Sequence, residues 1–511
     1  MADSINIMGL VGTGVMGAGI AQIAAQAGVQ VRLFDARDGA AQVARDNLGR
    51  TFATLVGKGK ISQQAMDDAL HNLQVISAVE ELAGCDLVVE AIVENLEVKR
   101  SLIAQLEAVV STACILASNT SSLSVTAIAA GSQRPQRIAG FHFFNPVPLM
   151  RIVEVIEGLA TEASVGDRLL AFAQRIGHRG VRAKDTPGFI VNHAGRAYGT
   201  EALKMLDEGV SSKGEIDRIL RDGAGFRMGP LELMDLTGLD VSHPVMESIF
   251  TQYYNEPRYK PSPLTRRMLV GGHLGRKVNQ GFYRYENGQR VDTPEPQAVP
   301  SGVQLPPVWI AAENADDHQR LSELLIALGA DLEHGEQPSA AALCLLAPYG
   351  RDATSAALHF GTDPQRTVCI DLLTDLARQR TLMLTPATDT TLRDAAHALF
   401  ARDGVGVSVI NDSVGFVAQR TLAMVVNLGC DIAQQRIASV DDIDQAVHLG
   451  LGYPHGPLTW GDQLGAQRIL LILQRMSELT ADPRYRPSPW LRRRAALGLS
   501  LCHQEPAVTA V

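Results

Sequence analysis

The sequence predicts an α/β domain followed by a helical domain, and after these a second, diverged pair of similar regions. Short apolar runs alternate with helix-forming stretches from residue 5 to about residue 185. Beyond Asp185 the apolar residues recur at helical spacing. Several motifs then return about 227 positions later. At roughly 150 residues per domain, a chain of 511 residues has room for three or four domains.

The first strand-like run is followed at once by a glycine-rich turn. Residues 5–11 (INIMGLV) lead into Gly12, Gly14 and Gly17, and residues 18–27 are rich in helix formers. In such a turn the first glycine permits a tight bend, the second lets the backbone approach a pyrophosphate, and the third allows close packing of helix and strand. The helix start offers N–H groups to phosphates, so Val15 and Met16 are also expected at the cofactor.

An acidic residue at the end of the next strand points to NAD. Residues 29–34 read as a second strand and lead into Asp35, 21 residues after Gly14. A carboxylate at this place accepts hydrogen bonds from the ribose hydroxyls and repels a 2′-phosphate. The sequence therefore predicts a Rossmann-type domain that prefers NAD over NADP. The flanking Arg32 and Arg37 would soften that preference.

Polar residues follow two further strand-like runs, residues 86–93 and 114–118. Ligands of parallel α/β sheets bind beyond the carboxyl ends of the strands. Glu94, Asn119 and Ser121 are therefore expected at that rim.

A histidine and a glutamate lie on two adjacent predicted strands. His142 belongs to residues 138–148 (IAGFHFFNPVP), and Glu154 has apolar neighbours on both sides in residues 151–156 (RIVEVI). A buried carboxylate needs a partner, and His142 is the nearest candidate. Such a pair leaves one imidazole nitrogen free to take a proton from an alcohol as hydride leaves its carbon. The alternative interpretation is a core histidine beside aromatic neighbours.

At this point the chain resembles the NAD-dependent L-3-hydroxyacyl-CoA dehydrogenases of fatty-acid β-oxidation, over about residues 5 to 285. The motifs that carry the resemblance are GLVGTGVMG at 9–17, VVEAIVENLEVK at 88–99, SNTSSL at 118–123, GFHFFNPVPLMRIVEVI at 140–156, KDTPGFIVN at 184–192 and GRKVNQGFY at 275–283. The resemblance implies an enzyme that oxidises a (3S)-3-hydroxyacyl-CoA to the 3-oxoacyl-CoA.

The resemblance also implies roles for the reacting groups. His142 would be the general base and Glu154 its partner, Ser121 and Asn192 would hold the reacting group, and Asn145 would lie on the thioester and pantetheine side. Without the resemblance, Ser121 reads as a helix cap and Asn192 as a polar helix residue.

Further residues are implied at the cofactor. Glu94 and Lys99 would line the NAD site with Asp35, Asn119 would lie beside the nicotinamide end, and Lys277 would reach the cofactor from the helical domain. The family often offers a serine and a lysine to the CoA phosphates, and this chain departs from that pattern. The basic residues in that region are Arg45, Arg50, Lys58 and Lys60, and the sequence does not decide which of them meets the nucleotide.

The second half repeats the helical domain without the chemistry. Asp185-Thr-Pro-Gly-Phe189 returns as Asp412-Ser-Val-Gly-Phe416, and Gly229-Pro-Leu231 returns as Gly456-Pro-Leu458. At the same offset His142, Glu154 and Asn192 become Cys369, Thr381 and Gln419, so this half is expected neither to bind NAD nor to catalyse. The predicted divisions are a Rossmann domain over 1–185, a helical domain over 186–285, a Pro-rich linker over 286–307, a degenerate Rossmann-like segment over 308–411 and a second helical copy over 412–503.

Composition excludes several other classes. A net charge of −9 argues against a nucleic-acid binder. The six cysteines form no C-x-x-C pair, so no metal site is expected and the thiols suit a reducing cytoplasm. The longest uncharged stretch, residues 109–133, is rich in Ser, Thr and Asn, and no membrane span or secretory signal is expected.

Acyl specificity and assembly are left open. Chains of this length resemble the bacterial 3-hydroxyadipyl-CoA dehydrogenases of phenylacetate degradation, and Arg196 or Arg227 would be candidates for the acyl carboxylate. The alternatives are a short-chain 3-hydroxybutyryl-CoA dehydrogenase and a non-catalytic, crystallin-like NAD-binding relative. The predicted domains account for the length of the chain and leave no room for a fused hydratase domain. The helical domains are expected to pair, either in a homodimer or within one chain as a pseudo-dimer.

Overall fold

A computed structural model describes residues 4–293 and 295–505. The chain forms two compact units. The first comprises the residues up to His193 together with Gln435–Leu451, and the second comprises Ala194–Gln434 together with the residues from Gly452 onward. In the described part of the chain, no helix combines the length and the apolar character that crossing a bilayer requires.

The first unit is built on an eight-stranded sheet with the order β3-β2-β1-β4-β5-β6-β7-β8. Neighbouring strands are parallel except β6 and β7. The carboxyl ends of β1, β2, β4, β5 and β6 therefore share one edge, as predicted for a Rossmann-type domain. The strands are β1 (Ile7–Val11), β2 (Gln30–Phe34), β3 (Leu73–Val75), β4 (Leu87–Glu90), β5 (Ile115–Ser118), β6 (Ile138–Phe143), β7 (Ile152–Glu157) and β8 (Arg179–Lys184).

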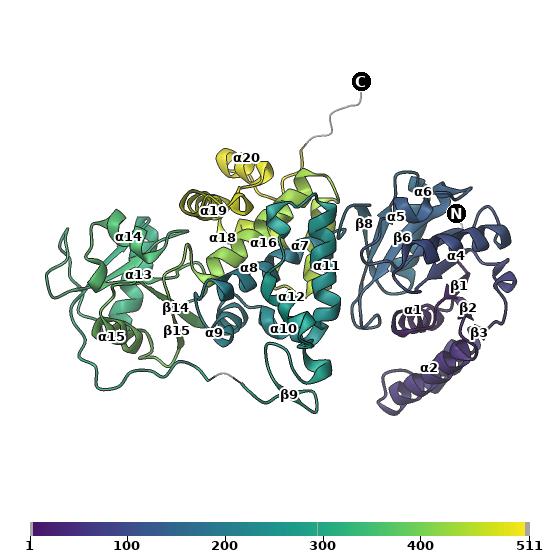
Figure 1. Ribbon diagram of the computed structural model, residues 1–511, viewed down its shortest axis with the longest axis horizontal. Coiled ribbons are helices and arrows are strands. Elements are labelled where there is room, and N and C mark those ends of the chain that lie inside the picture. The colour runs from purple at the N-terminus through teal and green to yellow at the C-terminus, as the bar shows by residue number, and fades with distance from the viewer. Residues whose placement is uncertain (1–3, 294, 506–511) are drawn as a thin grey trace, which may run out of the picture. The chain divides into compact units, whose positions relative to one another are not determined.

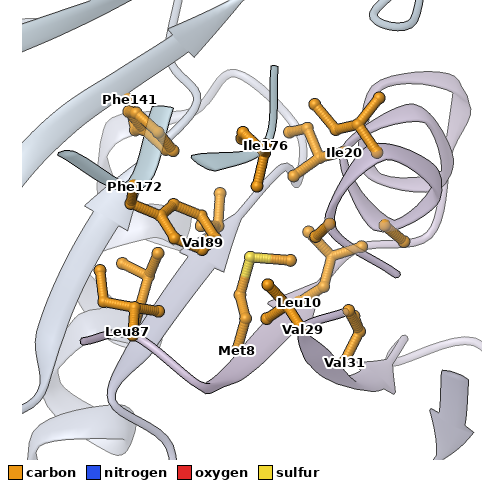
Figure 2. Packing of buried hydrophobic residues seen from close by; sticks show 14 of the residues in the cluster. Met8, Leu10, Ile20, Val29, Val31, Leu87, Val89, Phe141, Phe172 and Ile176 are labelled. Atoms are coloured by element: carbon orange, nitrogen blue, oxygen red, sulfur yellow. The ribbon is translucent and has the colours of Figure 1, made fainter. Parts of the chain in front are cut away.

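Helices cover this sheet and close its core. They are α1 (Val15–Gln26), α2 (Ala40–Gly57), α3 (Gln63–His71), α4 (Leu96–Val109), α5 (Val125–Ala129), α6 (Ala163–Arg175) and α17 (Val440–Leu451), and α7 (Val191–Ala194) ends at the boundary of the unit. Figure 2 shows Met8, Leu10 and Val89 of the sheet clustered with Ile20 of α1 and Phe172 of α6. All five are buried, so the sheet edge that carries the polar residues rests on a close-packed apolar layer.

The second unit contains two related sets of helices (Figure 1). The first set is α8 (Arg196–Asp207), α9 (Lys213–Arg218), α10 (Pro230–Thr237), α11 (Leu239–Gln252) and α12 (Pro263–Val270), and the second is α16 (Val417–Gln434), α18 (Pro457–Leu464), α19 (Ala466–Thr480) and α20 (Pro489–Leu497). The repeated Gly-Pro-Leu motifs have one local function, because each places glycine at the N-cap and proline at the first position of α10 or α18.

The two helical sets pack directly on each other. Helix α8 lies against α16. Buried ion pairs run in both directions, because Arg258 of the first set lies 2.9 Å from Asp431 and Arg484 of the second lies 3.3 Å from Glu201. Each arginine is followed by a tyrosine, in the pairs Arg258-Tyr259 and Arg484-Tyr485. This repeated Arg-Tyr motif therefore joins the two sets. The segment predicted as a Pro-rich linker, residues 286–307, begins with a short antiparallel hairpin. Its strands are β9 (Tyr285–Glu286) and β10 (Gln289–Arg290).

A five-stranded sheet completes the second unit, in the order β11-β12-β13-β14-β15. The strands are β11 (Val308–Ala312), β12 (Leu343–Ala347), β13 (Thr367–Ile370), β14 (Gln379–Leu384) and β15 (Gly406–Ile410), with α13 (Ala315–Ala327), α14 (Ala353–Phe360) and α15 (Thr390–Phe400) beside them. Only β13 and β14 are antiparallel, which matches the pattern of β4 to β8. Within the described residues this sheet has no counterparts of β1, β2 and β3, so it lacks the half of the fold that carries the glycine turn.

Strand register changes one prediction about this sheet. A constant offset of 227 equates His142 with Cys369 and Glu154 with Thr381. His142 lies directly opposite Glu154, but the residue that bonds to Thr381 is Asp371, whose N–H donates to the Thr381 carbonyl at 3.1 Å. The structural counterpart of His142 is therefore Asp371, because the pairing of β13 with β14 is shifted by two residues.

Asp371 is an acid in an unfavourable place. Burial raises its pKa to about 6, although Gln419 and the Leu373 N–H each donate to Oδ1 at 2.9 Å. Its Oδ2 is buried and has no hydrogen-bond partner among the described residues. Because the folded pKa exceeds the unfolded one, the contribution of Asp371 to stability is fully present below about pH 4 and is lost as the pH rises to 6.

We therefore expect Asp371→Asn to stabilise the protein near neutral pH. The substitution removes the charge but keeps the acceptor oxygen, so the gain should be on the order of 1–3 kcal/mol at pH 7.5 and should vanish near pH 4. Thermal unfolding at both pH values measures the difference, with the exposed neighbour Asp375→Asn as the control. An equal change of melting temperature at both pH values would contradict this account of Asp371.

Candidate active site

The glycine turn of the first unit leaves room for a phosphate. Gly12 has a φ of +93°, and a Cβ there would come within 2.8 Å of the Ala91 carbonyl oxygen. A Cβ at Gly17 would lie 1.9 Å from the Gly12 carbonyl oxygen, whereas a Cβ at Gly14 would meet nothing within 4 Å. Among the described residues no side chain caps the first turn of α1, where Val15 and Met16 lie. Open space above free N–H groups fits a dinucleotide pyrophosphate.

Asp35 lies at the end of β2 and is held ionised. Thr13 donates to its Oδ2 from both N–H (2.8 Å) and hydroxyl (2.9 Å), and the Arg37 guanidinium donates to both oxygens. The Arg37 guanidinium is the main reason why the pKa of Asp35 lies well below its usual range. Arg32 instead donates to the Glu81 carbonyl, so of the two flanking arginines only Arg37 contacts Asp35.

A cavity of about 430 Å³ lies next to the glycine turn. Its walls come from the turn and α1, from α2, and from the loop after β6 that contains Asn145. The residues that line it are Thr13, Gly14, Val15, Ala18, Gly19, Gln22, Ala44, Asn47, Leu48, Thr51, Asn145, Pro146, Val147 and Pro148. Asn145 and the glycine turn therefore face one space. Its lining includes none of the basic candidates Arg45, Arg50, Lys58 and Lys60.

Glu94 organises the polar rim beyond β4 and β5. Its Oε1 accepts hydrogen bonds from the Thr120 hydroxyl at 2.7 Å and from the N–H groups of Ser121 and Ser122 at 2.9 and 3.0 Å. Burial opposes ionisation of this carboxyl, but these hydrogen bonds and nearby Lys99 outweigh it and hold its pKa below the usual value. The loop that presents Ser121 is thus fixed by Glu94. Asn119 accepts from the Phe143 N–H at 2.9 Å and links the rim to β6.

Lys99 is an interior residue. It is 1 % exposed, and its ammonium lies 2.8 Å from Glu90 Oε1 and 3.4 Å from Glu94 Oε2. The buried Lys99 side chain thus forms ion pairs with two carboxylates, of which Glu90 is the nearer. Its predicted contribution to the NAD site would therefore pass through Glu94.

His142 and Glu154 form a buried pair across the antiparallel strands β6 and β7. His142 Nδ1 lies 2.7 Å from Glu154 Oε2, and the two residues are 5 % and 0 % exposed. The other oxygen of Glu154 accepts from the N–H groups of Ile190 and Val191 at 2.8 and 2.9 Å. With Glu154 ionised, Nδ1 carries a proton and Nε2 is the nitrogen available as a base. The core-histidine interpretation does not explain a carboxylate at this position.

Asn192 and Ser121 lie next to each other. The Asn192 side chain donates to the Ser121 carbonyl at 3.3 Å, and Asn192 follows directly after the backbone that binds Glu154. Within one unit, hydrogen bonds thus join His142 to Glu154 and Asn192 to Ser121, and the backbone from Val191 to Asn192 connects the two pairs. The duplicate keeps one of these links, because Gln419 donates to the Pro348 carbonyl at 3.1 Å, each residue 227 positions later.

The remaining predicted residues belong to the second unit. Lys277 forms an ion pair with Asp240 there. Burial lowers the pKa of Arg196 to about 10. Arg227 lies within 4 Å of the position that a Cβ at Gly452 would take. Their contacts with cofactor or substrate stay predictions.

Two residues with structural roles near these motifs were not predicted from the sequence. Thr13, inside the glycine motif, donates two hydrogen bonds to Asp35. Asp185 accepts from the Ser124 hydroxyl at 2.6 Å and from the N–H groups of Val125 and Thr126 at the start of α5. The repeat was an available signal, because Asp412 makes the equivalent bonds to Ala353 and Thr354.

Comparison with known proteins identifies the family. Residues 7–186 match the 3-hydroxyacyl-CoA dehydrogenase NAD binding domain, and residues 188–285 and 415–500 both match the C-terminal domain of the same family. The helical domain is therefore present twice, as the repeat indicated.

Individual relatives agree with this. The 3-hydroxyadipyl-CoA dehydrogenase of Escherichia coli K12 is 38 % identical over 97 % of this chain and 99 % of its own. A crystal structure described as 3-hydroxybutyryl-CoA dehydrogenase from Escherichia coli K12 has a TM-score of 0.84 and 36 % identity, with 97 % of this chain and 99 % of that chain covered. The 3-hydroxybutyryl-CoA dehydrogenase of Mycobacterium tuberculosis H37Rv is 37 % identical over 56 % of this chain and all of its own. The chain belongs to the 3-hydroxyacyl-CoA dehydrogenase family and is an NAD-dependent oxidoreductase.

Proposed function

We propose that His142 is the general base of the 3-hydroxyacyl-CoA oxidation and that Glu154 is the group that orients it. The observation that carries the proposal is the buried contact of 2.7 Å between His142 Nδ1 and Glu154 Oε2, together with the two backbone N–H groups on the other oxygen of Glu154. This arrangement fixes the imidazole tautomer and leaves Nε2 to act on the substrate.

In the forward reaction His142 Nε2 takes the proton of the C3 hydroxyl. Bound NAD supplies the hydride acceptor at the nicotinamide. The imidazolium that forms is stabilised by the negative charge of Glu154, which lies in a buried site where water screens little. In the reverse reaction the same imidazolium returns the proton to the alkoxide oxygen.

Ser121 and Asn192 position the reacting group in this proposal. Support comes from the hydrogen bond between them and from Glu94, which fixes the Ser121 loop. Gly12, Gly14 and Gly17 with the start of α1 would hold the pyrophosphate, Asp35 would hold the adenosine ribose, and Asn119 would lie by the nicotinamide. Asn145 would contact the pantetheine side from the wall of the cavity.

For the acyl group we propose 3-hydroxyadipyl-CoA, with 3-hydroxybutyryl-CoA as the alternative. Support comes from the relative of that name, which matches nearly the whole chain, whereas the Mycobacterium relative matches only about half of it. The terminal carboxylate of an adipyl chain calls for an arginine, and Arg196 and Arg227 are the candidates.

We also propose the domain divisions given by the sequence and the pairing of the two helical copies within one chain.

Replacement of His142 tests the base. His142→Gln should lower kcat on the order of 10²- to 10⁴-fold while NAD binding is retained, because only the proton acceptor is lost. His178→Gln is a matched control, since His178 is as buried but bonds to the Val147 carbonyl and not to a carboxylate. Near-normal turnover of His142→Gln would exclude His142 as the base.

Replacement of Asp35 tests cofactor choice. Asp35→Ala removes the predicted ribose acceptor and releases Arg37, so kcat/KM with NAD should fall about 10- to 100-fold and the preference over NADP should disappear. Steady-state kinetics with both cofactors measure the ratio, with Asp46→Ala on the exposed face of α2 as control. An unchanged ratio would show that Asp35 does not select the cofactor.

A substrate comparison tests acyl specificity. We expect kcat/KM for 3-hydroxyadipyl-CoA to exceed that for 3-hydroxybutyryl-CoA by at least about tenfold, the value of one charge-assisted hydrogen bond. Raised salt should reduce the difference if an exposed ion pair carries it. A preference for 3-hydroxybutyryl-CoA would overturn the proposed acyl group and leave the reaction untouched.

A further inference from the structure

Helix α17 connects the non-catalytic half of the chain to the catalytic unit. By sequence it lies in the second helical copy, yet it packs against β7 and β8 of the first unit. Five of its buried residues recur at helical spacing and form an apolar stripe: Val440, Ile443, Ala446, Val447 and Gly450. The helix also buries one acidic residue, Asp444. Two polar contacts hold its start, because the Lys184 N–H donates to the Ile437 carbonyl at 2.9 Å and Arg179 lies 2.7 Å from Asp441.

The equivalent contact occurs a second time, with the roles of the two halves of the chain exchanged. In the second unit the Asn411 N–H donates to the Val210 carbonyl at 2.9 Å, and both pairs of residues differ by 227 positions. In the first helical copy, the segment equivalent to α17 thus packs against β14 of the five-stranded sheet. Gly223 in that segment corresponds to Gly450. Each helical copy therefore packs one segment against the sheet of the other half, but only one of the two sheets carries His142 and Glu154.

Close to its end, α17 touches the backbone that holds Glu154. A Cβ at Gly450 would lie 3.0 and 3.2 Å from the two methyl carbons of Val191 and 3.6 Å from Ile152 on β7. Val191 is 1 % exposed, and its N–H donates to Glu154. One continuous series of contacts therefore runs from the α17 backbone through Val191 and Glu154 to His142.

We propose that α17 is a positioning element of the active site, which sets Val191 and through it the orientation of the Glu154 carboxylate. The second half of the chain would then contribute to catalysis without binding a substrate. This inference rests on the proposed role of Glu154. A substitution at Gly450 tests this inference most directly, because the absence of a side chain there allows α17 to approach Val191 closely.

The test is Gly450→Ala in the full chain, with Gly223→Ala as the matched control. A methyl group at 450 must displace Val191, whereas one at 223 meets Gln379 at an ordinary 3.5 Å. Since misplacement of a catalytic group by about 1 Å costs up to 100-fold, we expect Gly450→Ala to lower kcat about tenfold without weakening NAD binding. The acid limb of its kcat/KM profile should move to lower pH, because a displaced Glu154 stabilises the imidazolium less. Gly223→Ala should match the unsubstituted protein.

Hydrogen exchange gives a readout that does not depend on turnover. Peptides spanning residues 188–193 should exchange faster in Gly450→Ala. In Asp441→Asn, which removes the shorter of the two ion pairs of Arg179 but keeps Asp442 at 3.6 Å and the packing, they should exchange about two- to fivefold faster. Unchanged kinetics and exchange in Gly450→Ala, or equal losses in Gly223→Ala, would overturn the proposal. Turnover by His142→Gln would instead overturn the proposed role of the base, while the exchange data would still report on α17.

Discussion

The buried carboxylate of Glu154 is the interaction on which the rest of the site depends. A charge with no exposure costs several kcal/mol to bury, and three hydrogen bonds to it, each worth about 1.5–3 kcal/mol, offset that cost. One comes from His142 on β6 and two from the backbone after β8, so the pair can form only when these segments are assembled. The His142–Glu154 contact is therefore present only when β6, β7 and the segment after β8 have come together.

The catalytic half was largely predictable from the sequence, because its signals are local. The glycine turn and Asp35 are short-range motifs, and Glu154 among apolar residues required a partner on a neighbouring strand. Long-range relations were not predictable. The association of α17 with the first unit depends on where two distant segments meet, and the place of Asp371 depends on a shift in strand pairing that a constant sequence offset conceals.

The second half of the chain has a smaller sheet than the first half. Its sheet corresponds to β4 through β8, and in the part of the chain that the structure describes it lacks the strands that carry the glycine turn, so the second half differs from the first in structure as well as in sequence motifs. What it keeps are the parts that face other segments: the Arg-Tyr ion pairs, the Gly-Pro-Leu helix starts and the helix that docks beside β8. At the position that corresponds to His142 the second half has Asp371, whose pKa is raised by burial, so that its ionisation near neutral pH opposes stability.

The central claim is that Glu154 holds His142 with its proton on Nδ1. Proton NMR of the chain labelled with ¹⁵N-histidine observes this directly. We predict one strongly downfield Nδ1–H resonance, absent in His142→Gln and lost in Glu154→Gln while the other histidine signals persist. A His142 that carries its proton on Nε2, or a resonance that survives Glu154→Gln, would contradict the account.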